Sequence, residues 1–197
     1  MSETGAASNL LQMNGYQQAA AGTAPALKAA RDVSLVEAVR RGDRESFGRL
    51  YDLYGPMVHA VLLARVPCAE VDDLVQDVFL VAFRMIHTLR EAGAFGGWLA
   101  MIARNRATDF HRRKRETEEL PENLARRKPM DAEASEALET IRSLPEAYRE
   151  TLIMRLAEGM TGPEIAERTG MTPASVRVNL HRGMKLLRGK LGMEKGR

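Results

Sequence analysis

Large apolar residues recur along most of this chain at spacings of three and four, the pattern of helices that bury one face. The clearest run extends from Val71 to Leu89. Its apolar positions are Val71, Leu74, Val75, Val78, Phe79, Ala82, Met85, Ile86 and Leu89. Runs of alternating β-branched residues bounded by turn residues, which would predict strands, do not occur. The sequence therefore predicts an all-α protein.

Two breaks divide the helical pattern before this run. Gly42 and Asp43 are typical of a helix stop followed by the N-cap of the next helix, with Ser46 three residues on. We expect Gly55-Pro56 to end that helix, so that another one continues to Pro67. These helices are predicted to be scaffold.

The stretch from Phe95 to Arg115 places two different faces on one predicted helix. Its apolar face lies within one arc of a helical wheel and comprises Trp98, Leu99, Ile102 and Phe110. Polar and cationic residues occupy the far side and its margin: Arg104, Asn105, Thr108, His111, Arg112 and Arg115. One face is expected to be buried, and the other favours a negatively charged partner.

The last third of the chain predicts a helix-turn-helix. A helix from Ala134 to Ser143 and a second one ending at Gly159 come first. A short helix with a capping box of Thr161 and Glu164 then leads to a turn at Gly170. A long final helix follows Thr172-Pro173, and its outward face carries Ser175, Arg177, Val178, His181, Arg182 and Lys185. Such a second helix can enter the major groove of DNA, where arginine pairs with guanine.

The polar face of the Val71–Leu89 helix contains a further signal. Asp73, Gln76 and Asp77 lie there, yet Leu80 and Phe83 share that side. Apolar residues among acids on a solvated face indicate a protein-docking patch, although scattered surface apolar residues would explain it about as well.

Three glycines follow Arg90 within a short loop that ends at Phe95 and Trp98. Such a loop could hold an unstacked base on an aromatic ring, which contributes about 1–3 kcal/mol per base. A plain turn between two helices, with Trp98 in the core, is the alternative interpretation, and for Trp98 alone it is the better one.

Composition sets the organisation of the 197 residues. The low aromatic content of 5% and the abundance of helix formers agree with helices. Cys68 is the single cysteine of the sequence, which excludes an internal disulfide. We expect a disordered extension at residues 1–31, a helical domain at 32–115, an acidic linker at 116–133 and a second domain at 134–197. No apolar run reaches the ~20 residues of a membrane span, so a cytoplasmic protein is expected.

Catalysis is not supported by any cluster of residues. Asp72, Asp73 and Asp77 resemble part of a magnesium site on an all-α enzyme, but Asp72 points about 100° away from Asp73 and no second acidic cluster occurs. The histidines lie in separate elements, and no cysteine–histidine spacing suggests zinc. We therefore predict no catalytic residue, no metal and no cofactor.

Three motifs together resemble the extracytoplasmic-function sigma factors, the small sigma subunits of bacterial RNA polymerase. They are DLVQDVFLVAF from Asp73, GGWLAMIARNRATDFHRR from Gly96, and LPEAYRETLIMRLAEGMTGPEIAERTGMTPASVRVNLHRGMKLLR from Leu144. The resemblance covers about residues 33–115 and 134–191 in the order and spacing of that family. It implies two helical domains, regions two and four, that recognise promoters for the polymerase.

This resemblance assigns expected roles at matching positions. The residues expected to dock on the clamp helices of the polymerase β-prime subunit are Asp73, Gln76, Asp77, Leu80 and Phe83. Recognition and melting of the minus-ten element fall on Arg90, Phe95, Trp98, Arg104, Asn105, Thr108, Arg112 and Arg113. Contacts to the minus-thirty-five element fall on the outward face of the last helix, Ser175 to Lys185, and its domain is also expected to bind the β flap.

The resemblance also implies an anti-sigma partner that holds the protein inactive. Val178 departs from the small polar residue usual in the family, and Gly183-Met184 stands where Ala-Arg is more common, so no promoter sequence is inferred. Two other classes remain: a helix-turn-helix regulator with a helical effector domain, and a helical interaction module. The regulator would not need the Asp73–Phe83 patch, and the module would not explain Arg177 to Lys185.

Overall fold

A computed structural model describes residues 30–117 and 132–191 of the chain, and within these ranges it contains helices and no strand. The first helix covers residues 30–40. The remaining elements are α2 (Arg44–Leu63), α3 (Cys68–Met85), the 3-10 turns η1 (Ile86–Thr88) and η2 (Ala92–Ala94), α4 (Phe95–Thr117), α5 (Ala132–Arg142), α6 (Glu146–Leu156), α7 (Gly162–Thr169) and α8 (Pro173–Lys190). The all-α prediction is confirmed. Residues 1–29 of the expected N-terminal extension and residues 118–131 of the expected linker lie outside the described residues, whereas residues 30 and 31 belong to the first helix.

Local capping signals set several of these boundaries. Gly42 has a φ of 96°, and the Asp43 carboxylate accepts hydrogen bonds from the backbone N–H groups of Glu45 (2.9 Å) and Ser46 (3.3 Å). The capping box of Thr161 and Glu164 is present at the start of α7. Asp43 and the capping box satisfy backbone donors that have no partner within their own helix, and Gly42 ends the helix before Asp43.

The turn between α7 and α8 also forms as predicted. Gly170 adopts the left-handed conformation with a φ of 71°. Thr172 then caps α8 through the backbone N–H of Ser175, and Pro173 occupies the first turn, where its missing N–H costs no hydrogen bond. The helix-turn-helix pattern is thus present.

The expected break at Gly55-Pro56 is wrong, because α2 runs through Pro56 without interruption. A proline inside a helix removes one backbone hydrogen bond and strains the preceding turn. Here Tyr54, Met57 and Val58 on both sides are buried in the core. Their packing stabilises a helical backbone that the local sequence disfavours.

The Val71–Leu89 helix ends earlier than its apolar pattern predicts. α3 stops at Met85, and the chain continues as the 3-10 turn η1. Met85 is consequently exposed, although its spacing placed it on the buried face. Ile86 and Leu89 are still buried, because the tighter turn returns them to the core.

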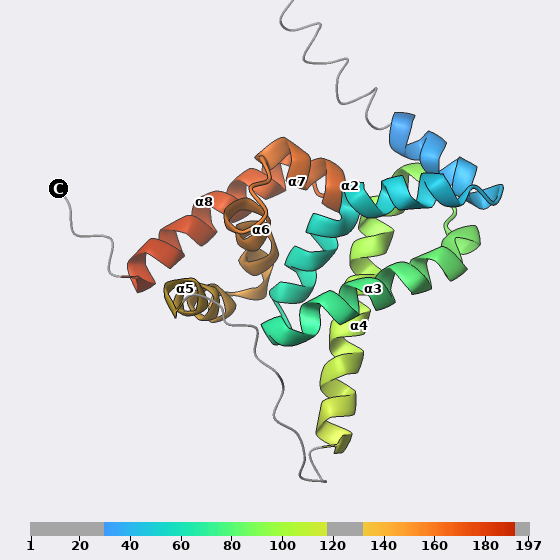
Figure 1. Ribbon diagram of the computed structural model, residues 1–197. Helices are drawn as coiled ribbons and strands as arrows, with labels where there is room; N and C mark the ends of the chain where they lie inside the picture. The colour runs from blue at the N-terminus through green and yellow to red at the C-terminus, as the bar shows by residue number, and fades with distance from the viewer. Residues whose placement is uncertain (1–29, 118–131, 192–197) are drawn as a thin grey trace, which may run out of the picture.

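The elements form two groups that pack against each other (Figure 1). α2, α3 and α4 pack together in the first group, and α5 to α8 form the second. α2 and α4 contact α6 and α7 across the boundary, so the core is continuous between the groups. The C-terminal end of α4 extends beyond both groups (Figure 1).

Candidate polymerase and nucleic-acid interface

The outward face of α3 carries the predicted docking patch. Its five residues are all exposed: Asp73, Gln76, Asp77, Leu80 and Phe83. Leu80 is 54% exposed and Phe83 is 41% exposed. The Phe83 ring also meets the Phe47 ring of α2 edge to face, with centroids 4.9 Å apart, which holds one side of the patch in place. The structure therefore brings all five residues together on one accessible surface.

The loop before α4 is arranged differently from the expectation. Arg90 is exposed, but Phe95 is only 1% exposed and lies in the core. Its ring packs edge to face on Tyr54 at 5.0 Å and lies 5.9 Å from the half-buried ring of Trp98. In this conformation Phe95 anchors the start of α4, and its ring cannot stack on a base.

Leu99 and Ile102 of the predicted apolar face of α4 are buried, and Trp98 and Phe110 are partly buried against the core. Ala103 and Ala107 are buried with them. Of the predicted nucleic-acid contacts, Asn105, Thr108 and Arg112 are exposed on the opposite side. Arg113 is also exposed, but on the side next to α3, where it lines a small pocket with Leu74 and Asp77. The Thr108 hydroxyl donates to the Arg104 carbonyl at 3.0 Å, and Arg112 pairs with Asp109 at 3.0 Å. The cationic end of the helix lies on the part of α4 that extends past the bundle (Figure 1).

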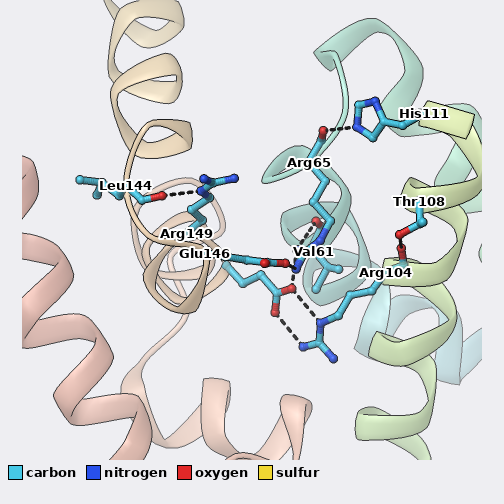
Figure 2. A network of polar contacts seen from close by, with 9 residues as sticks. Val61, Arg65, Arg104, Thr108, His111, Leu144, Glu146 and Arg149 are labelled. Atoms are coloured by element: carbon cyan, nitrogen blue, oxygen red, sulfur yellow. Dashed lines mark hydrogen bonds and ion pairs between the residues drawn. The ribbon is translucent and has the colours of Figure 1, made fainter. Parts of the chain in front are cut away.

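Arg104 is the exception on this face, because it pairs with a residue of the second group. Its guanidinium donates two hydrogen bonds of 2.8 Å to the two carboxylate oxygens of Glu150 in α6. Arg65, just beyond α2, contacts the same carboxylate at 2.5 Å and the exposed Glu146 at 2.7 Å. Figure 2 shows Arg65 and Arg104 directed at the carboxylates of α6.

This pairing shifts the pKa of its members. Burial by itself would raise the pKa of Glu150, but the hydrogen bonds from Arg104 and the charge of Arg65 outweigh it and hold that pKa below its ordinary value. The hydrogen bonds to Glu150 raise the pKa of Arg104, despite the opposing effect of its partial burial. Glu150 is therefore ionised at neutral pH.

Sequence reasoning did not find Arg65 or Glu150. Arg65 follows the end of α2, and Glu150 lies 46 residues from Arg104, so neither helical spacing nor a motif connects them. The only signal available was helical spacing, which places Glu150 one turn from the apolar Ala147, Ile153 and Met154, and this pattern names no partner.

Other polar contacts join the same two groups. Arg142 at the end of α5 donates to the Leu63 carbonyl at 3.1 and 2.9 Å and to the Val66 carbonyl at 2.5 Å. His59 of α2 lies 2.6 Å from a carboxylate oxygen of Glu158. These contacts bind the end of α2 and its middle to the second group.

A buried cluster lies at the far end of this boundary. The Tyr54 hydroxyl donates to Asp32 at 3.0 Å, while Arg168 of α7 lies 3.6 Å from the same carboxylate and 4.8 Å from the Tyr54 ring centroid. Burial and the negative charge of Asp32 raise the pKa of the Tyr54 phenol well above its ordinary value. The phenol is thus a permanent donor to Asp32.

α8 presents the predicted duplex-reading face. Val176, Gly183 and Leu187 anchor the helix on its buried side. The opposite side exposes the whole predicted set: Ser175, Arg177, Val178, His181, Arg182 and Lys185. This face can enter a DNA groove without any rearrangement of the helix.

The described residues form neither a metal-ion cluster nor a membrane-spanning helix. Over residues 30–117 and 132–191 no group of three or more histidine, cysteine, aspartate or glutamate side chains is arranged to hold a metal ion. None of the helices in these ranges has the length and apolar content needed to cross a bilayer.

The two helical groups match two known families. Residues 50–117 match Sigma-70 region 2, and residues 134–187 match Sigma-70, region 4. The chain is 30% identical to the ECF RNA polymerase sigma-E factor of Escherichia coli over 179 residues, which span 81% of this chain and 94% of that protein. The chain therefore belongs to the extracytoplasmic-function sigma factors of RNA polymerase, as the motifs predicted.

Other relatives agree with this assignment. The ECF RNA polymerase sigma factor BldN of Streptomyces coelicolor is 31% identical over 171 residues, which span 80% of this chain and 65% of BldN. CnrH, solved in complex with the cytosolic domain of CnrY, has a TM-score of 0.59 at 24% identity and covers 84% of this chain and 99% of CnrH. The sigma factor RpoE of Bartonella quintana, solved with the anti-sigma factor NepR, has a TM-score of 0.51 at 19% identity. The match covers 77% of this chain and 99% of that RpoE chain. The two solved structures share the fold.

Proposed function

We propose that this chain is a sigma factor that directs the RNA polymerase core to specific promoters and assists promoter melting. The observation that carries the proposal is the presence of both sigma regions, in order, in one chain. Each region exposes the face that its role requires, an acidic and apolar one on α3 and a cationic one on α8. A helix-turn-helix regulator with an effector domain is not favoured, because it would need neither region 2 nor the α3 patch.

The proposed roles follow the exposed faces. The α3 patch, defined by Asp73, Gln76, Asp77, Leu80 and Phe83, docks on the polymerase, because apolar side chains give such contacts most of their energy and the acids set their orientation. The α8 face from Ser175 to Lys185 reads the minus-thirty-five element. Arg90, Trp98 and the cationic side of α4 meet the minus-ten element, while Phe95 holds the start of α4 from the core.

The remaining assignments rest on the family. Its members are DNA-binding initiation factors, so we assign this chain no catalytic residue and no cofactor. We place it in the cytoplasm, where RNA polymerase acts. We also expect an anti-sigma partner, because CnrH and the Bartonella RpoE, which share this fold, were solved bound to other proteins, in the second case an anti-sigma factor.

Transcription in vitro tests the proposal. Purified chain added to core polymerase should direct initiation from a cognate promoter selected from genomic fragments. Leu80→Ser should weaken core binding by roughly tenfold, about 1.4 kcal/mol, because the exposed Leu80 side chain is buried on docking. Core affinity is measured by fluorescence anisotropy of the labelled chain.

Met101→Ser is the control, since Met101 is an apolar residue with a similar exposure of 49%, on α4 of the same group and outside the α3 patch. It should leave core affinity unchanged. Failure of the wild-type chain to bind core or to direct any initiation would refute the proposed function. Equal loss in both serine variants would remove the docking role of the α3 patch.

A further inference from the structure

Glu150 occupies a position that is unusual for a carboxylate. It is only 8% exposed, and its two oxygens face two arginines of the other helical group. Arg104 binds it with two parallel hydrogen bonds of 2.8 Å, and Arg65 approaches one oxygen at 2.5 Å. The side chains of Arg65 and Arg104 are 16% and 39% exposed. The pair of arginines thus forms an anion site that region 4 fills with its own carboxylate.

The chemistry of this site suits a phosphate equally well. A guanidinium presents parallel N–H donors that fit carboxylate and phosphate oxygens in the same way. Arg104 lies on the α4 face that is proposed to meet DNA. Arg65 pairs with the same Glu150 carboxylate as Arg104. A phosphate of the DNA backbone would take the place now held by the Glu150 oxygens.

We propose that Glu150 is an internal substitute for a DNA phosphate, and that the packed arrangement of the two regions excludes DNA from the Arg65–Arg104 pair. Arg65 is then a DNA contact that becomes accessible only when region 4 moves away. The identity of the competing ligand as DNA rests on the proposed function. Closure, by which we mean the packing of the two regions held by Glu150 and the two arginines, does not rest on it.

The exclusion follows from electrostatics. A buried carboxylate that loses both arginines is left unpaired at a site of low polarity, which is strongly unfavourable. When DNA takes Arg104 and Arg65, Glu150 must therefore move into water, and α6 must move with it. The apparent DNA affinity is the affinity of the open form multiplied by its population, so a change that releases Glu150 strengthens DNA binding by the factor with which it raises that population.

The same boundary offers a second way to open the structure. At Gly96, in the first turn of α4, an added Cβ would lie 2.9 Å from the carbonyl carbon of Arg168 in α7, closer still to its oxygen, and 2.9 Å from Cε1 of the Tyr54 ring in α2. The ring can shift more readily than the α7 backbone, so the main clash is the one between the two regions. At the neighbouring Gly97, an added Cβ would make an ordinary contact of 3.4 Å with the Thr169 carbonyl oxygen. Gly96→Ala should therefore separate the two regions without any change of charge, and Gly97→Ala should not.

The first experiment measures closure in the full chain without polymerase. One fluorescent dye is attached to each region, and the distance between the dyes is followed by energy transfer. Glu150→Gln should increase the distance, because a neutral amide holds two arginines poorly. Glu136→Gln, which changes an exposed carboxylate of α5 outside this cluster, should leave the distance near the wild-type value.

The second experiment measures affinity for a single-stranded and a duplex oligonucleotide by anisotropy. Glu150→Gln should raise the affinity by roughly 5- to 150-fold, the usual range of coupling between two linked equilibria. Glu136→Gln removes the same unit of charge outside the cluster, so it measures the gain that comes from net charge alone. Adding Arg65→Gln or Arg104→Gln to Glu150→Gln should abolish the extra gain.

Two further variants separate this mechanism from a loss of folding. Gly96→Ala should open the structure and raise DNA affinity with all charges in place. The exchange Glu150→Arg with Arg104→Glu should restore closure without restoring DNA binding at position 104. Circular dichroism and thermal unfolding confirm that each variant remains folded.

The proposal is overturned if Glu150→Gln matches Glu136→Gln in both the distance and the DNA affinity. It is also overturned if Gly96→Ala opens the structure with no gain in affinity. These results are independent of transcription in vitro. A chain that opens on Glu150→Gln but fails to direct initiation would refute the proposed function and leave the closure by Glu150 standing.

Discussion

Asp43 illustrates how a single residue sets the start of a helix. Its carboxylate accepts two backbone N–H bonds and also a hydrogen bond of 2.7 Å from the Ser46 hydroxyl. The Ser46 hydroxyl is the largest of the causes that lower the pKa of Asp43. All of these atoms lie within three residues of one another, so the sequence alone predicted this cap.

Asp43→Ala should lower the free energy of unfolding by about 1 kcal/mol, because the first turn of α2 loses the acceptor of two of its N–H groups. Denaturant titration of the full chain, followed by circular dichroism, measures the change. Asp52→Ala, which removes an exposed carboxylate from the middle of the same helix, is the control and should change stability by less. Equal effects would show that Asp43 does not act as a cap.

Other residues depend on partners that are distant in the sequence, and these could not be predicted. Phe95 was expected to stack on a base, yet it packs against Tyr54, 41 positions earlier in the chain. Arg104 was predicted correctly to lie on the polar side of α4, but its partner Glu150 comes from another helix. Helical spacing defines which side of a helix a residue lies on, but not what that side faces.

At the scale of elements, periodicity predicted the helices and several of their ends. The errors occur where packing overrides a local signal, as at Pro56 inside α2, or where the helix type changes, as at Met85. Gly183 gives the opposite case. It was noted only as a departure from the family pattern, and the structure supplies its reason.

Gly183 allows α8 to lie close to α6. A Cβ at this position would lie 3.0 Å from Cδ1 of Leu152 and 3.1 Å from Cβ of Tyr148. These distances are shorter than ordinary van der Waals contacts, so a larger side chain must push the two helices apart. The glycine thus positions the duplex-reading helix on its support.

Gly183→Val should destabilise the chain by about 1–3 kcal/mol through overpacking between α6 and α8. Gly48→Val on α2 is the control, because an added Cβ there meets nothing within 4 Å. It should be neutral or slightly stabilising, since valine has a better helix propensity than glycine. Thermal unfolding checks both variants, and a neutral Gly183→Val would contradict the close-approach argument.

For the whole molecule, the arrangement of the two regions should depend on pH. The pKa of Glu150 is lowered from 4.5 when it is paired with Arg104 and Arg65, and it returns to that value when the regions separate. The pairing of Glu150 with the two arginines therefore stabilises the packed arrangement fully above pH 4.5. This stabilisation is lost as the pH falls through the lowered pKa of Glu150. Acid should favour the open form.

Energy transfer between dyes on the two regions, recorded from pH 7 downward, measures this transition. Wild-type protein should open below pH 4.5, and Glu150→Gln should already be open at neutral pH with no further step in this range. Circular dichroism recorded in parallel separates opening from acid unfolding. A wild-type distance that stays constant while the helices remain intact would contradict the assignment to Glu150.

Arg142 gives the boundary between the regions one further property. The last carbonyl groups of a helix lack partners within it, and α2 obtains one for Leu63, and for Val66 beyond it, from a side chain of α5. Separation of the regions therefore exposes these carbonyl groups to water. It also frees the Arg142 side chain to adopt other rotamers, and ordering such a long side chain costs up to about 2 kcal/mol. The open form thus gains conformational entropy in the second region, and this contribution to its free energy grows as the temperature rises.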